Sequence, residues 1–203
     1  MKTKLERFAC DLILAPLAPL AGLMGFWWGA YALLPETWIP FVAIAGLLAG
    51  ILADIFWLKK LLDHRLGLPL WVAVFLFYSI GVFGLFMGLP VFNAALAIPA
   101  GFVVGSRLAA ENADQLRVRK AAQRMAWFTT AVLTFICAAS ALIALASSST
   151  AGDLRGMLGL GFEITQSMII GLTLVGGAAL LVVGWGLTVA SVRITYSFLQ
   201  RKI

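Results

Sequence analysis

The residues best placed to do chemistry lie in an apolar stretch, where Asn93 falls between Pro90 and Pro99. A proline inside a helix frees the carbonyl four residues earlier, and for Pro99 that carbonyl belongs to Ala95. Many transporters build a midplane site from a broken helix with a polar group beside it. We expect Asn93 to line a cavity that opens to the outside. The plain alternative is a proline kink in a structural span.

Three further polar residues are candidates for the same cavity. Asp54 is the acidic residue set deepest in an otherwise apolar run, about 7 Å from Lys59 along the helix axis. It suits either a proton or cation site or a carboxylate near the interface that pairs with a Lys or Arg. Glu163 and Gln166 are three residues apart, so they share one face of a helix. They could gate the cavity from outside, or they could simply be a solvated helix start.

A basic segment, 107–124, contains neither Gly nor Pro and is rich in helix formers. The sequence predicts that a neighbouring apolar helix continues into it. Its cations suit contact with anionic lipid or with an acidic face of a cytoplasmic partner. The residues expected to make this contact are Arg117, Arg119, Lys120 and Arg124.

Catalytic patterns are missing from the chain. It has no Gly-x-Ser-x-Gly, Walker, His-Glu-x-x-His or Cys-x-x-Cys pattern, and its single histidine, His64, cannot make a zinc site. We therefore predict no catalytic residue, no metal and no cofactor, and a protein that is not an enzyme. An intramembrane lipid-modifying enzyme is the least favoured class, kept open because such enzymes can lack recognisable motifs.

Composition predicts an all-α integral membrane protein with one membrane-embedded domain, 1–203. Hydrophobic residues make up 62% of the chain and charged residues 12%, whereas soluble domains are roughly half apolar and about 25% charged. Runs long enough to span a bilayer predict a compact bundle of about six helices. The predicted spans are 10–34, 38–58, 68–87, 89–106, 125–146 and 164–192, and 107–124 is the cytoplasmic connector.

The distribution of Lys and Arg predicts the orientation of these spans. With six spans, 14 of the 15 cations fall on one side and only Arg155 on the other, so the positive-inside rule places both termini in the cytoplasm of a plasma (inner) membrane protein. The net charge of +6 then reflects topology, and we expect no nucleic-acid partner.

Glycines and aromatic residues predict how the bundle packs. Four pairs with Gly-x-x-x-Gly spacing predict close helix contacts within the bundle or at a homo-oligomer face. These pairs are Gly25 and Gly29, Gly46 and Gly50, Gly84 and Gly88, and Gly101 and Gly105. Aromatic residues near span ends, which are expected to be interfacial anchors, are Trp38, Trp71, Trp127 and Tyr196.

Two functional hypotheses follow. The first is a small transporter, channel or transporter subunit with a cavity at Asn93. The second is a non-catalytic membrane subunit or scaffold that works through a cytoplasmic or membrane partner.

Overall fold

The computed structural model describes residues 11–58, 67–86, 88–147, 150–159, 161 and 165–201, and all of its regular structure in these ranges is helical. The chain divides into two compact units, Met1–Phe77 (unit 1) and Tyr78–Ile203 (unit 2). Helix α5, Leu68–Leu85, contains the boundary between them. That the whole chain acts as one domain stays a prediction.

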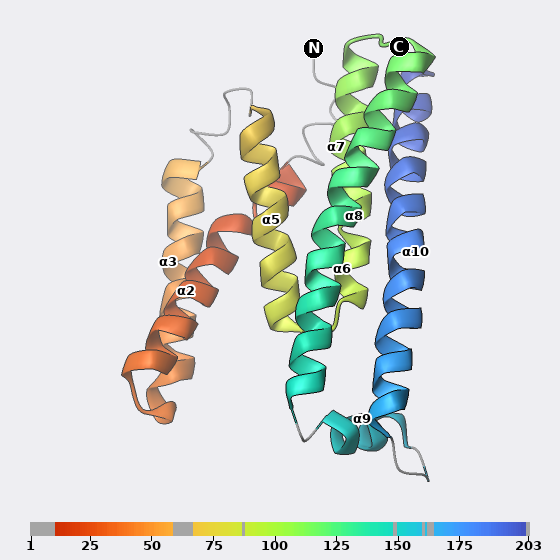
Figure 1. Cartoon of the computed structure of the whole chain (residues 1–203). Coiled ribbons are helices and arrows are strands. Elements are labelled where there is room, and N and C mark those ends of the chain that lie inside the picture. The colour runs from red at the N-terminus through yellow and green to blue at the C-terminus, as the bar shows by residue number, and fades with distance from the viewer. Residues whose placement is uncertain are drawn as a thin grey trace. The chain divides into compact units, whose positions relative to one another are not determined.

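Unit 1 is built around a hairpin of two apolar helices. Helix α2 (Leu17–Leu33) is followed by a 3₁₀ turn, η1 (Glu36–Trp38), and by α3 (Ile39–Ala53), which ends in a π-helical turn, η2 (Asp54–Leu58). Pro40 occupies the first turn of α3, where its missing N–H removes no helical hydrogen bond. The two helices lie side by side in Figure 1.

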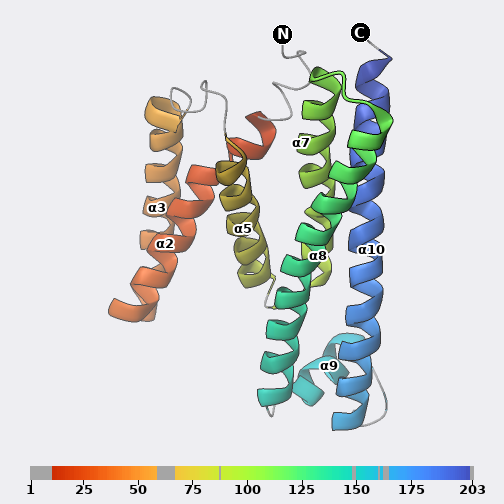
Figure 2. The same ribbon diagram turned by 45° about the horizontal axis from the view of Figure 1, so that its top comes forward.

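Among the residues that the structure describes, unit 2 contains the end of α5 and five further helices. They are α6 (Val91–Ala95), α7 (Ala97–Ala110), α8 (Gln115–Ala146), α9 (Thr150–Leu158) and α10 (Gln166–Gln200). Helices α7, α8 and α10 pack against one another, and the short α9 crosses the end of the unit opposite the α7–α8 turn (Figures 1 and 2).

The predicted break in the fourth apolar run is confirmed. Helix α6 ends at Ala95, Leu96 adopts a turn, and α7 begins at Ala97, which places Pro99 in the first turn of the new helix. A first-turn residue needs no N–H for a helical hydrogen bond, so the interruption accommodates the proline. Gly88, with φ +82°, makes the turn that precedes α6, a left-handed conformation that glycine adopts without strain.

The count of long apolar helices differs from the predicted six. Five helical segments of the described residues are long and apolar enough to cross a membrane. They are Asp11–Leu33, Glu36–Phe56, Val91–Ala110, Gln115–Ala146 and Gln166–Gln200. The third predicted span, 68–87, is represented by the shorter apolar helix Pro69–Leu85, which at about 1.5 Å per residue is about 26 Å long.

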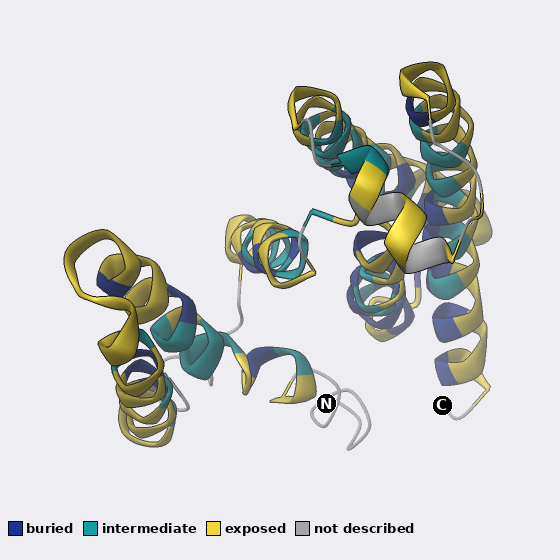
Figure 3. Ribbon diagram, turned by 90° about the horizontal axis from the view of Figure 1, so that it is seen from below, coloured by how far each residue is buried: buried dark blue, intermediate teal, exposed yellow. Residues whose placement is uncertain are grey.

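Two of the four glycine pairs make the predicted close contacts. A β-carbon on Gly105 would lie 2.7 Å from the Val192 carbonyl oxygen, and one on Gly101 would lie 2.6 Å from the Ser191 β-carbon, so α7 approaches α10 where only glycine fits. In unit 1, Gly46 and Gly50 of α3 meet the backbone of α2 in the same way. Figure 3 shows the buried residues gathered on the inner faces of α7, α8 and α10.

The other two pairs do not behave as predicted. A side chain at Gly25 or Gly29 would meet no described atom within 4 Å, so this pair marks no close helix contact. Gly88 lies in a turn, so it cannot share a helix face with Gly84.

Candidate functional site

Asn93 is buried in unit 2, with 6% of its surface exposed. Its Nδ2 donates a hydrogen bond of 2.7 Å to the Ser79 carbonyl oxygen of α5. Because a carbonyl can only accept, this bond fixes the orientation of the amide and assigns Nδ2 to the Ser79 side. The side chain therefore links α6 to α5 across the turn at Gly88.

The second polar atom of Asn93 has no partner among the described residues. Its Oδ1 is buried and accepts no hydrogen bond there. An unpaired buried acceptor is costly, so this atom suits a water molecule or another neutral donor. Pro90 precedes the first turn of α6 and Pro99 lies in the first turn of α7, so both prolines shape the backbone on either side of Asn93.

The remaining candidates are not gathered around Asn93. Asp54 belongs to unit 1, where it begins the π-helical turn after α3; its carboxylate makes no hydrogen bond or ion pair with the described residues. Gln166 is exposed at the start of α10, whose cap is the Thr165 side chain, accepting from the Met168 N–H at 3.4 Å. Glu163, and Lys59, a cation close to Asp54 in the sequence, lie outside the described residues.

Hydroxyl groups that were not singled out from the sequence connect the three long helices of unit 2. Thr129 of α8 and Thr188 of α10 are 2.8 Å apart through their Oγ1 atoms, and both are buried. Ser191 of α10 donates to the Ile98 carbonyl of α7 at 2.7 Å. No spacing rule reveals such pairs in advance, because their partners are 59 and 93 residues apart in the chain.

Tyr196 corrects one of the sequence predictions. It is 5% exposed, and its hydroxyl donates to the Ala113 carbonyl oxygen at 2.5 Å in the α7–α8 turn. The ring is therefore packed inside unit 2 and is not an exposed interfacial anchor. The nearby Gln200 Nε2 donates to Asn112 Oδ1 at 3.4 Å, which also ties the end of α10 to this turn.

The basic segment predicted to be helical is helical on both sides of a short turn. Helix α7 continues to Ala110, and α8 starts at Gln115 with Asp114 as its cap, whose Oδ1 accepts from the Arg117 N–H at 3.0 Å. The turn between α7 and α8 forms one end of unit 2. That end holds Arg107, Arg117, Arg119, Lys120, Arg124, Arg193 and Arg201, while Arg155 of α9 lies at the other end (Figure 1).

An apolar core lies at the same basic end of unit 2. It joins residues of α7, the turn, α8 and α10, namely Leu108, Ala109, Ala113, Val118, Ala122, Val192, Tyr196 and Leu199. Apolar burial stabilises helix contacts in water, but it gives no comparable driving force in lipid. A core of this kind is what a helical end that projects into water requires.

No family model, no curated protein and no solved structure matches this chain. The site is therefore interpreted from its geometry alone. Within the described residues, no group of three or more His, Cys, Asp or Glu side chains could hold a metal ion. What the geometry offers instead is a set of interhelical hydrogen bonds and one exposed basic end.

Proposed function

We propose that this chain is a non-catalytic subunit or scaffold of a larger membrane complex, embedded through six spans with both termini in the cytoplasm. The observation that carries the proposal is the hydrogen bond from Asn93 to the Ser79 carbonyl. The Asn93 amide, which was expected to line a cavity, instead connects α6 to α5. The contacts of Thr129 with Thr188 and of Ser191 with Ile98 have the same character.

The placement of charge supports the proposed orientation. Seven cations and two acids, Glu111 and Asp114, gather at the end of unit 2 formed by the α7–α8 turn and the C-terminal part of α10. This end would face the cytoplasm under the positive-inside rule. Its apolar core supports a projection into water, and the plasma (inner) membrane is the proposed location.

The length of α8 supports the same orientation. Its residues from Gln115 to Arg124 would form about 15 Å of helix on the cytoplasmic side, at about 1.5 Å per residue. The remainder, 125–146, would be about 33 Å long, which suits a hydrocarbon core of about 30 Å.

A small transporter or channel is the second candidate, and one observation favours it. The buried Oδ1 of Asn93 lacks a partner among the described residues, so a hydrated pocket or a ligand with a neutral donor could occupy this position.

Native mass spectrometry of the tagged chain, released from its own membranes in mild detergent, separates the two candidates. A scaffold is expected to carry a second polypeptide in fixed stoichiometry, and Asn93→Leu should lower stability without releasing it. A chain that carries no other subunit, but a small molecule lost in Asn93→Leu, would overturn the scaffold proposal. Thr134→Val is the matched control, because within the described part of the chain that exposed hydroxyl donates to the Thr130 carbonyl of its own helix and to no other helix.

A further inference from the structure

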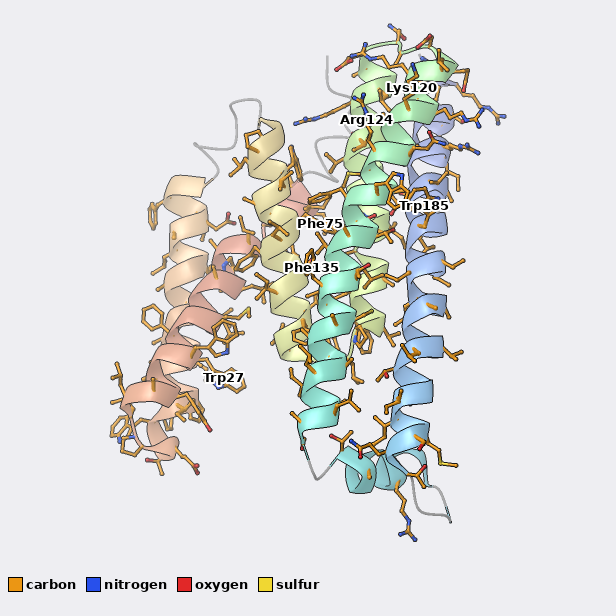
Figure 4. The ribbon with its side chains drawn as sticks, viewed as in Figure 1. Trp27, Phe75, Lys120, Arg124, Phe135 and Trp185 are labelled. Atoms are coloured by element: carbon orange, nitrogen blue, oxygen red, sulfur yellow. The ribbon has the colours of Figure 1, made fainter. Side chains whose placement is uncertain are left out.

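The outward face of α8 changes from basic to aromatic to apolar along its length. Lys120, Arg124 and Trp127 are separated by four and three residues, so they lie on one face of the helix. All three are exposed, and the buried residues of α8, Val118, Ala122, Ala126, Thr129 and Leu133, follow a different face. Figure 4 shows Lys120 and Arg124 near the α7–α8 turn, with Phe135 farther along α8 from that turn.

Two of the cations on this face have no acidic partner among the described residues. Arg117, the first cation of α8, already has an acidic partner, because it forms an exposed ion pair with Glu111 at 2.9 Å. Lys120 and Arg124 form no ion pair with any residue that the structure describes. Their charges are therefore available to an anion from outside this part of the chain.

The aromatic residue below the cations indicates their depth. Trp127 is 68% exposed, and its ring meets that of Trp185 of α10 edge to face, with 4.8 Å between centroids. Tryptophan prefers the boundary between headgroups and hydrocarbon. At about 1.5 Å per residue, Arg124 lies about 4.5 Å and Lys120 about 10.5 Å from Trp127 along the axis. Both side chains can therefore reach the level of lipid phosphates.

The rest of the face suits acyl chains. Phe135 is 75% exposed and Leu142 is 70% exposed, and both continue the face below Trp127. A ligand that has an anionic head and long apolar chains would complement the whole length of this surface. An acidic protein would complement only its first two turns.

We propose that Lys120 and Arg124 form a two-cation site for the headgroup of an anionic phospholipid in the cytoplasmic leaflet, with its acyl chains lying along α8 below Trp127. The inference rests on the proposed membrane insertion. The positive-inside rule explains why cations lie on this side of the membrane, whereas the proposed site assigns headgroup binding to two residues on one face of α8. Arg119, about 100° around the helix from Lys120, is outside the site.

The test uses the full chain in nanodiscs that contain equal amounts of phosphatidylcholine and phosphatidylglycerol. It compares how much of each lipid the wild type and the variants retain. Native mass spectrometry is expected to show preferential retention of phosphatidylglycerol by the wild type. Lys120→Gln with Arg124→Gln should reduce that preference on the order of tenfold, since each cation near an anionic surface contributes a several-fold effect. The charge-retaining pair Lys120→Arg with Arg124→Lys should keep it.

The matched control is Arg119→Gln with Arg201→Gln, which removes two exposed cations from the same end but not from the site. An equal loss of preference in the control, or an unchanged preference in Lys120→Gln with Arg124→Gln, would overturn the proposal. Loss of a co-purifying acidic protein with lipid retention intact would assign the surface to that protein instead. Alkaline extraction of the cell membranes that contain the chain tests insertion separately, because a chain that is extracted contradicts the membrane proposal itself.

Discussion

Thr129 of α8 and Thr188 of α10 face each other across the interior of unit 2, with their hydroxyl oxygens 2.8 Å apart. Each hydroxyl is also within hydrogen-bond distance of a carbonyl of its own helix, at Ala126 and Gly184. A hydroxyl has one proton, so when one threonine donates across the interface, the other can donate to its own helix. The pair thus satisfies both hydroxyls without water.

Replacing either threonine by valine keeps the shape and removes the interhelical bond. We expect Thr129→Val and Thr188→Val each to lower the free energy of unfolding, with a coupling energy of about 0.6 kcal/mol and no more than about 1.7 kcal/mol. Steric trapping of the two single variants and the double variant measures it. Thr173→Val, which removes a bond within one helix only, should show no coupling to Thr129→Val.

The close approach of α7 to α10 predicts that replacement of glycine by alanine will affect stability very differently at different positions. Gly101→Ala and Gly105→Ala should each destabilise the protein by about 1–3 kcal/mol, because the new β-carbon overlaps α10. Gly171→Ala and Gly186→Ala add the same methyl group where no described atom lies within 4 Å, and should leave stability unchanged or raise it. Equal effects at all four positions in SDS titration would contradict the helix packing described above.

The link between Tyr196 and Ala113 predicts that the hydroxyl, and not only the ring, holds the α7–α8 turn. Tyr196→Phe removes the donor and leaves the Ala113 carbonyl without it, at a cost of about 1 kcal/mol. A lower Tm in detergent checks this. The exposed Tyr31 supplies the control, since Tyr31→Phe should leave Tm where it is.

The proposed topology is tested with reporter fusions. We expect fusions at Glu36, Gly88 and Asp153 to report the outside, and fusions at Asp63, Asn112 and the C-terminus to report the cytoplasm, because of the 14-to-1 distribution of cations. The fusion at Gly88 is the most informative, since it decides whether the short helix Pro69–Leu85 spans the membrane. A C-terminus outside the cytoplasm would contradict the six-span proposal.

Much of the helical architecture follows from local sequence physics. Apolar length indicated the five long helices, and Pro99 indicated the break that the structure places at Leu96. The turn at residues 111–114 was missed, although Asp114 is a favoured helix cap and Asn112, with φ 49°, tolerates the left-handed conformation. High helix propensity on both sides obscured that signal.

The candidate site was less predictable than the fold. Burial of Asn93 follows from the cost of an amide in hydrocarbon, but its Ser79 partner depends on how α5 packs after the turn. Gly25 and Gly29 have the same spacing as the pairs that make close contacts, but no other helix that the structure describes lies beside them. The spacing alone therefore does not predict a helix contact. Contacts between distant segments need the packed structure, and a single sequence does not contain them.

Helices α8 and α10, packed side by side in unit 2, are expected to differ in stiffness. Over 32 residues α8 has neither glycine nor proline, whereas α10 carries Gly171, Gly176, Gly177, Gly184 and Gly186 within 35 residues. Glycine weakens a helix by up to about 1 kcal/mol relative to alanine. A force applied at the basic end would therefore leave α8 straight, while α10 would bend near its glycines. Thr188, which contacts Thr129 of α8, lies two and four residues beyond Gly186 and Gly184, so bending at these glycines would displace one side of that contact.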